Sequence, residues 1–315
     1  MAYDMILIER ADRRICTAKR KLEGTNMSGY TIITDSCCDL GMDRVQQWGL
    51  KYTPLRLTDA ALEHQVERAG TEGIHLFYEA MRDGAAPKTS ATTTEQWIQN
   101  AQPELEAGRD VLMLTFSSAL SGTYQAAHIA AQELSEQFPS RKVIAVDTRC
   151  ASLGLGLLVY HVVQQQRSGA TIEEAAAYAE AHKLQLCHWF TVDSLTYLRR
   201  GGRISGATAL AGTILGIKPV MHVDDEGRLI AVGKRRGRKA SMEALADQLA
   251  ETAIRPEEQT IFISHGDCLD EARQLEQMIR SRTPIKDCYI NPVGPVIGAH
   301  SGPGTLALFF YGTHR

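Results

Sequence analysis

Three loops of this 315-residue chain carry hydroxyl or imidazole groups in patterns that suit the binding of an anion. The first, Ser117–Thr123, follows an apolar run and precedes a helical pattern, so free backbone N–H groups and the positive end of a helix dipole face one point. Ser121, Gly122 and Thr123 are its candidate ligand-binding residues. Plain capping of the following helix by Ser121 is the alternative interpretation.

Two further loops are weaker signals when each is taken alone. Lys88–Thr94 is rich in hydroxyl side chains, and Thr89 and Ser90 are its candidate ligand-binding residues, although such clusters are ordinary turns in most proteins. Gly298–Gly304 surrounds His300 with glycine and proline, which leaves the imidazole room to face a ligand. A lone histidine is more often a structural residue, so this interpretation stays open as well.

Two basic segments form the fourth feature. Tyr197–Ser205 contains Arg199, Arg200 and Arg203 beside a pair of glycines, and Lys234–Lys239 is a basic run. A planar guanidinium donates hydrogen bonds in pairs, which suits phosphate or carboxylate groups. We predict that the three arginines, together with the basic run, dock a partner protein or neutralise phosphate. Simple solvation of a charged surface is the alternative.

Composition excludes several classes of protein. Hydrophobic residues make up 44% and charged residues 23% of the chain, which is typical of a soluble globular protein. With 34 basic and 37 acidic residues the net charge is −3, so we expect no nucleic-acid partner and at most transient membrane contact. Seven cysteines form no CxxC pair, which favours a reducing cytoplasm. The pattern contains no metal-binding cluster, and we expect no cofactor.

The sequence pattern around these loops predicts strands that alternate with helices. This pattern predicts an α/β fold of two domains with mainly parallel sheets, residues 29–170 and residues 171–315. Residues 1–28 are predicted to be an extension outside the fold, too rich in charge for a signal peptide. Five short β-branched or apolar runs are the predicted strands: Tyr30–Thr34, Val111–Phe116, Val143–Val146, Trp189–Val192 and Thr260–Ser264.

Local patterns add detail to two kinds of element. After the second predicted strand, apolar residues recur at three- and four-residue spacing from Tyr124 to Phe138, which predicts an amphipathic helix. Three strands end in an aspartate followed by a hydroxyl residue, at Asp35, Asp147 and Asp193. We predict that these side chains mostly cap the next helix, with a further role open for Asp35.

Taken together and in order, six segments make the chain resemble the DegV family of bacterial fatty-acid-binding proteins. Each segment alone is a weak signal, and the resemblance covers about residues 30–312. The segments are Thr34–Leu40, Lys88–Ser90, Ser117–Tyr124, Tyr197–Ile204, Ile217–Pro219 and His300–Gly304.

The resemblance implies a long-chain fatty acid in an apolar tunnel of a two-domain α/β protein. It implies that the carboxylate is held by Thr89, with Ser90 beside it, by Ser121 and by His300. It also implies a separate fatty acid kinase that phosphorylates the carboxylate to an acyl-phosphate for phospholipid synthesis, so this chain itself would not be an enzyme and would hold no catalytic residue. Many relatives have Ser-Thr or Thr-Ser where this chain has Cys37-Cys38, which leaves the role of that turn open.

Two alternatives come from other classes of function. The first is a phosphotransferase-like enzyme that uses His300 as nucleophile or base, although the sequence shows neither a P-loop nor a recognisable catalytic triad. The second is a sensor of some other amphipathic lipid, because the same loops suit any carboxylate or phosphate head group. The chain length of the lipid, its saturation and the oligomeric state are not encoded in any of these motifs.

Overall fold

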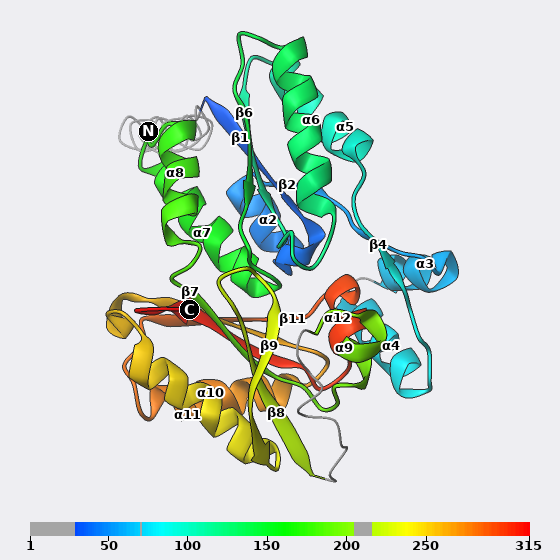
Figure 1. Ribbon diagram of the computed structural model, residues 1–315, viewed down its shortest axis with the longest axis vertical. Helices are drawn as coiled ribbons and strands as arrows, with labels where there is room; N and C mark the ends of the chain where they lie inside the picture. The colour runs from blue at the N-terminus through cyan, green and yellow to red at the C-terminus, as the bar shows by residue number, and fades with distance from the viewer. Residues whose placement is uncertain (1–28, 70, 205–215) are drawn as a thin grey trace, which may run out of the picture.

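The computed structural model describes residues 29–69, 71–204 and 216–315 (Figure 1). The predicted extension, residues 1–28, lies outside the described residues. Two β-sheets stand one above the other along the long axis of the molecule, and helices cover their faces. Among the described residues no helix combines the length and the apolar character that crossing a membrane requires.

The upper sheet in Figure 1 is parallel throughout, with strand order β2-β1-β5-β6. Its strands are β1 (Tyr30–Asp35), β2 (Lys51–Thr53), β5 (Asp110–Thr115) and β6 (Val143–Asp147). Alternate residues of β1 and β5 enter different cores. Ile33 and Met113 pack under α5 (Thr94–Glu106) and α6 (Thr123–Gln137), whereas Ile32 and Leu112 face α7 (Leu153–Arg167) and α8 (Ile172–His182). Because both faces are covered, the central strands are apolar on both sides.

Among the helices on the upper sheet, α5 and α8 begin with a capping box. The helices on this sheet are α2 (Met42–Trp48), α5 (Thr94–Glu106), α6 (Thr123–Gln137), α7 (Leu153–Arg167) and α8 (Ile172–His182). A capping box of Thr93 and Gln96 starts α5. In α6, Ala127, Ala131 and Leu134 are buried, which confirms the predicted amphipathic helix.

The lower sheet is mixed, with strand order β11-β10-β12-β7-β8-β9. Its strands are β7 (Leu186–Thr191), β8 (Ile217–Val223), β9 (Leu229–Arg236), β10 (Thr260–His265), β11 (Asp287–Pro292) and β12 (Leu306–Tyr311). The α/β class is confirmed, as are all five predicted strands. The expected parallel arrangement holds in the upper sheet, whereas here only β10 and β11 run parallel. The difference arises because β8 and β9 form a hairpin and β12 enters between β10 and β7.

Helix α7 lies between the two sheets and joins them into one core. It is buried on nearly every side, from Leu153 to Val163, as expected for a helix that is apolar all round. It contacts β5 of the upper sheet and β7, β10 and β12 of the lower one. Gly154 lets its first turn approach His188, because a Cβ there would lie 2.1 Å from the Nε2 atom of that ring. Outside this layer, α10 (Arg238–Thr252), α11 (Leu269–Arg280) and the short η3 (Pro256–Glu258) accompany the lower sheet.

The segment between β2 and α5 carries the candidate loop Lys88–Thr94 toward the lower half of the molecule (Figure 1). It contains β3 (Arg56–Leu57), α3 (Ala60–Ala69), α4 (Thr71–Arg82) and β4 (Thr89–Ser90). Helix α4 contacts α12 (Pro295–Ser301), and the Tyr78 hydroxyl donates a 2.9 Å hydrogen bond to the Val293 carbonyl oxygen. The short α9 (Thr196–Gly201) packs against α12 at the same place (Figure 1).

The division into two units, residues 29–170 and 171–315, stays a prediction, and the helix contacts bear on where its boundary would lie. Helix α8 follows residue 170, yet it contacts β5 and β6 of the upper sheet. We therefore propose that α8 belongs to the first unit, so that the boundary between the units lies between His182 and Leu186.

Candidate functional site

A pocket opens between the two sheets, with about 910 Å³ of empty space including its opening to solvent. Its floor is the inner face of the lower sheet, its roof is formed by the carboxyl ends of β1 and β5 and the start of α7, and α9 and α12 form a wall. Most of the lining is apolar. The larger apolar side chains are Leu55, Phe116, Leu120, Phe190, Leu198, Val223, Leu229, Val293, Val296, Ile297 and Phe309.

The register of the lower sheet shows which lining residues lie at the two ends of the pocket. Thr305, Ala307 and Phe309 all line it, and a strand rises about 3.3 Å per residue, so this lining extends about 13 Å along β12. His188 pairs with Phe309 and therefore lies at the end far from Thr305. The His300 loop leads directly into Thr305, so the candidate ligand groups lie at the near end.

His300 and Thr89 form the centre of this near end. The Nε2 atom of His300 lies 2.8 Å from Thr89 Oγ1, and both residues line the pocket. Burial, together with the charges of Arg203 and Arg200, lowers the pKa of His300 to about 4, so the ring is neutral at pH 7. Its other nitrogen, Nδ1, is buried against Gly201 and has no hydrogen-bond partner among the described residues.

The His300 ring can form its hydrogen bond with Thr89 in either tautomer, and Nδ1 lacks a partner among the described residues in both. When the proton is on Nε2, Thr89 Oγ1 accepts it. The Thr89 hydroxyl then keeps its own hydrogen for a group in the pocket. In that tautomer His300 would point the hydroxyl of Thr89 at a ligand.

The Ser117–Thr123 loop supplies the second hydroxyl. Ser121 Oγ accepts a 3.3 Å hydrogen bond from the Thr123 backbone N–H and lies 2.9 Å from Thr123 Oγ1, so it caps α6 and also lines the pocket. The loop is fixed from the lower sheet, because Ser117 Oγ donates a 2.9 Å hydrogen bond to the carbonyl of Gly227 in the β8–β9 turn. Gly227 has φ +82°, and a Cβ there would lie 2.2 Å from Ser117 Oγ.

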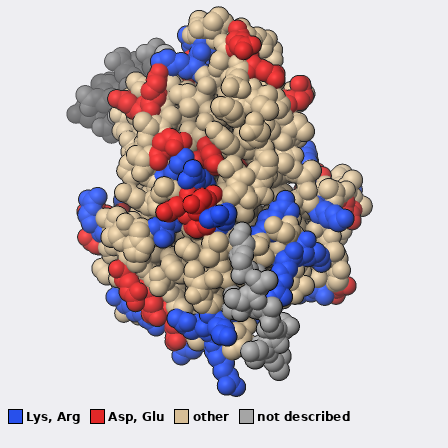
Figure 2. All heavy atoms as spheres, viewed as in Figure 1, with Lys and Arg blue, Asp and Glu red and all other residues tan. Residues whose placement is uncertain are grey.

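Arg203 adds a positive charge at the pocket. Its Nε donates to the Leu120 carbonyl at 3.3 Å and its Nη1 to the Gly201 carbonyl at 2.5 Å, which holds the guanidinium beside the Ser121 loop. Arg199 and Arg200 lie on the exposed face of α9 outside the pocket. Figure 2 shows Lys and Arg side chains gathered over α9 and over the far end of the β8–β9 hairpin.

The structure brings together most of the residues predicted from the sequence. Four candidate residues, Thr89, Ser121, Gly122 and His300, line one pocket, as does Arg203. Ser90 does not line it, because alternation along β4 turns its side chain to solvent. Thr123 is fully buried behind Ser121 and supports that residue without lining the pocket.

Sequence reasoning did not single out four other polar residues of the pocket. Ser152, His188, Ser264 and Ser301 all line it. His188 is nearly fully buried, and burial together with the nearby Arg315 charge lowers its pKa well below the ordinary value. A histidine inside an otherwise apolar strand is a signal that the sequence does offer. The three serines carry no comparable pattern.

The Cys37-Cys38 turn has a structural role and also contributes to the lining. It forms the short helix η1 (Ser36–Cys38), in which Asp35 accepts hydrogen bonds from the Cys37 N–H at 2.9 Å and the Phe116 N–H at 2.7 Å. The predicted cap at Asp35 is therefore confirmed, and it also ties β1 to the end of β5. Cys37 lines the pocket, and burial raises the pKa of its thiol well above the ordinary value, so the thiol stays protonated.

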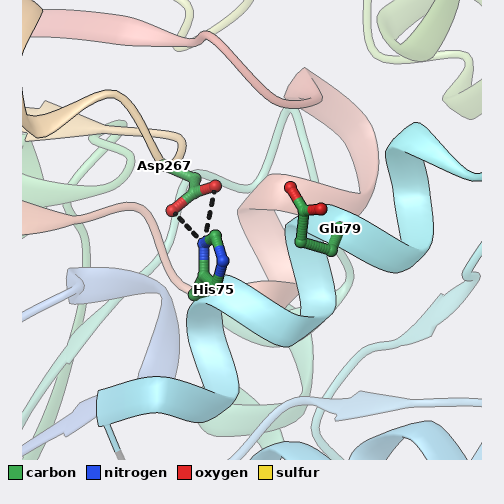
Figure 3. A group of neighbouring side chains, drawn as sticks. All are labelled: His75, Glu79 and Asp267. Carbon is green, nitrogen blue, oxygen red and sulfur yellow. Dashed lines mark hydrogen bonds and ion pairs between the residues drawn. The ribbon is translucent and has the colours of Figure 1, made fainter.

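A separate cluster of titratable groups, His75, Glu79 and Asp267, joins α4 to the loop after β10 (Figure 3). His75 Nδ1 lies 3.0 Å from Asp267 Oδ1. The Arg82 guanidinium contacts both carboxylates, at 2.6 Å from Glu79 and 2.5 Å from Asp267. Because these carboxylates already share a cation, we interpret the cluster as an exposed cross-link that holds α4 in place.

These features define an α/β protein with a largely apolar pocket between two sheets and, at its near end, hydrogen-bonding side chains together with the charge of Arg203. Residues 30–313 match the family model described as "Uncharacterised protein, DegV family". The chain belongs to the DegV family.

Relatives and solved structures agree with this assignment. A DegV domain-containing protein of Clostridium perfringens is 42% identical over 91% of this chain and 98% of its own length. A DegV family protein of Thermus thermophilus, whose structure is described as one of fatty acid binding, is 33% identical with a TM-score of 0.76, covering 90% of this chain and 99% of its own. A DegV lipid binding protein of Thermotoga maritima is 29% identical with a TM-score of 0.77, covering 91% and 99%.

Proposed function

We propose that this protein binds a long-chain fatty acid in the pocket between its sheets, with the carboxylate at the near end. The single observation that carries the proposal is the position of Thr89, Ser121 and His300 at one end of an apolar pocket. The Thermus thermophilus and Thermotoga maritima relatives, described as fatty acid and lipid binding, support the same ligand class.

The tail and the carboxylate contribute different amounts to the free energy of binding. Each buried methylene contributes about 0.8 kcal/mol, so about 14 of them give an upper bound near 11 kcal/mol. A hydrogen bond to a charged group contributes about 1.5–3 kcal/mol. The tail therefore sets most of the affinity, and the hydroxyl groups set the position of the carboxylate.

A separate fatty acid kinase is the proposed partner, and it would convert the bound acid to an acyl-phosphate that feeds phospholipid synthesis. The support is the exposed basic surface formed by Arg199 and Arg200 on α9 and by Lys234–Arg236 at the end of β9. Arg203 lies between this surface and the pocket, where its guanidinium would offset charge on the head group. In this proposal the chain is a carrier without catalytic residues or cofactor. Its six described cysteines are free, which supports a reducing cytoplasm.

The environment of His300 favours binding over catalysis. Its Nε2 is engaged by Thr89, and its Nδ1 is packed against Gly201. A pKa near 4 makes this ring a poor base at neutral pH, because proton acceptance is most efficient when the pKa lies near the working pH. No observation in the described part of the chain favours the phosphotransferase alternative.

The test is extraction of the purified protein with organic solvent, followed by mass spectrometry of the extract and native mass spectrometry of the intact protein. We expect a stoichiometric long-chain fatty acid, and weaker retention of it when Thr89 and Ser121 are both changed to alanine. Ser90→Ala is the matched control, because it removes an exposed hydroxyl from the same strand as Thr89. A protein without a bound acid that also takes up none when it is added would refute the proposal.

A further inference from the structure

Polar side chains interrupt the apolar lining beyond the candidate carboxylate site. Ser264 lies on β10 opposite Ala307 of β12, which lies opposite Phe190 of β7. Because Ala307 is two residues after Thr305, Ser264 lies farther from the near end of the pocket than Thr305 does. Ser264 is fully buried, and its side chain faces the pocket. A fatty acid with its carboxylate at Thr89 would pass this hydroxyl with the part of its chain nearer the carboxylate.

Ser264 belongs to a short chain of hydrogen bonds. Its Oγ lies 3.0 Å from Ser152 Oγ, which lies 2.5 Å from Asp39 Oδ2. Asp39 also accepts a 3.0 Å hydrogen bond from the Gly294 N–H, which leads into α12. A hydroxyl has one hydrogen, so when Ser152 donates to the Asp39 carboxylate, Ser264 donates to Ser152. The lone pairs of Ser264 then remain available to a donor in the pocket.

Ser301, at the end of α12, provides a second, independent observation. Only 6% of the residue is exposed, it lines the pocket, and its Oγ has no hydrogen-bond partner among the described residues. The following residue, Gly302, places its carbonyl oxygen 2.8 Å from the Cβ that Gly266 would carry. The segment with Ser301 therefore lies against Gly266, the residue that follows β10.

A plain hydrocarbon chain leaves both hydroxyl groups without new partners when it displaces water from them. Burying a polar group without a hydrogen bond is unfavourable, whereas a ligand hydroxyl is both donor and acceptor. Such a hydroxyl can donate to Ser264 or accept from Ser301. Resting on the fatty-acid-binding function above, we propose that the pocket selects a hydroxy fatty acid whose hydroxyl lies in the half of the chain nearer the carboxylate.

Binding titrations with chosen octadecanoic acids test this proposal. The probes are octadecanoic acid itself, 3-hydroxyoctadecanoic acid and 6-hydroxyoctadecanoic acid, added to delipidated wild-type protein and to a variant with both Ser264→Ala and Ser301→Ala. Thr305→Val is the matched control, because it removes a lining hydroxyl whose hydrogen is already donated to the Gly302 carbonyl. The readout is the ratio of the two dissociation constants, octadecanoic acid over hydroxy acid, within each protein.

We expect at least one hydroxy acid to bind wild-type protein about tenfold more tightly than octadecanoic acid, the effect of one satisfied buried hydroxyl. The ratio should fall to about one in the double alanine variant and stay near its wild-type value in Thr305→Val. Equal binding of all three acids to wild-type protein, or a preference that survives in the double variant, would overturn the proposal. If none of the acids binds, the fatty-acid-binding function itself fails.

Discussion

Gly201 is the residue through which the role of His300 can be tested without removing the imidazole. The ring lies between two neighbours: Thr89 Oγ1 is 2.8 Å from Nε2, and a Cβ on Gly201 would lie 2.3 Å from Nδ1. The added methyl group needs at least about 1 Å more room than it finds. Because Thr89 blocks movement in its own direction, the imidazole of a Gly201→Ala protein has to turn out of this position.

The expected loss of fatty-acid affinity follows from the hydrogen bond between His300 and Thr89 that the turned ring no longer makes. The ring stops orienting the Thr89 hydroxyl, so the carboxylate loses one charge-assisted hydrogen bond, about 1.5–3 kcal/mol. This corresponds to a dissociation constant about 10- to 100-fold higher for a long-chain fatty acid. Calorimetric titration of delipidated protein measures the affinity, and thermal unfolding confirms that the variant folds. Gly233→Ala is the matched control, because a Cβ there meets only ordinary contacts of 3.7 Å or more.

A double-mutant cycle makes this reasoning refutable. If Gly201→Ala acts only through the imidazole, it adds nothing to the loss caused by His300→Ala, and the effects of the two changes are strongly non-additive. Equal affinity of Gly201→Ala and wild-type protein would show that the position of the ring does not matter. Additive losses would show that Gly201 acts by another route.

Three further predictions concern charge. Burial raises the pKa of Asp39 to about 7, so its contribution to stability is present at low pH and is lost as the pH rises toward 7. Urea unfolding of both proteins at pH 4 and pH 8 measures this. The free energy of unfolding of Asp39→Asn, relative to that of wild type, should be up to about 4 kcal/mol higher at pH 8 than at pH 4, and a relative stability that does not change with pH contradicts the prediction. Arg200→Glu should lower acyl-phosphate formation by a fatty acid kinase while the fatty-acid dissociation constant stays within about twofold, and an equal fall in both would place Arg200 at the pocket. The hydrogen bond and charge of Asp267 raise the pKa of His75, so Asp267→Asn should lower that pKa in an NMR titration, and no change would refute the contact.

The sequence predicts best those elements whose pattern is local. β1, β5, β6, β7 and β10 are short β-branched or apolar runs, and each lies where the pattern places it. The pairing partners of the lower sheet are set over long distances, so no local pattern reveals them. Strand β12 comes last in the sequence yet lies between β10 and β7.

The same distinction applies to the site. Glycine and hydroxyl content marks the loops that hold Thr89, Ser121 and His300, because such loops need unusual backbone and free donors. Which of two adjacent hydroxyl residues faces the pocket depends on the alternation of a two-residue strand, and this separates Thr89 from Ser90. Ser264 is not identified for a related reason, since it differs from the apolar residues of β10 only by where the sheet turns it.

The origin of the four polar groups at the near end bears on how the protein holds a ligand. Ser121 follows a strand of the upper sheet, and Thr89 comes from the segment between β2 and α5. Arg203 follows α9, and His300 lies in α12. A carboxylate contacts all of them only when the two sheets keep their relative position. The contacts that fix this position, such as Asp39 to Gly294 and Ser117 to Gly227, are short hydrogen bonds between the two halves. Binding of the carboxylate therefore depends on the relative position of the two sheets, whereas binding of the tail needs only the apolar space between them.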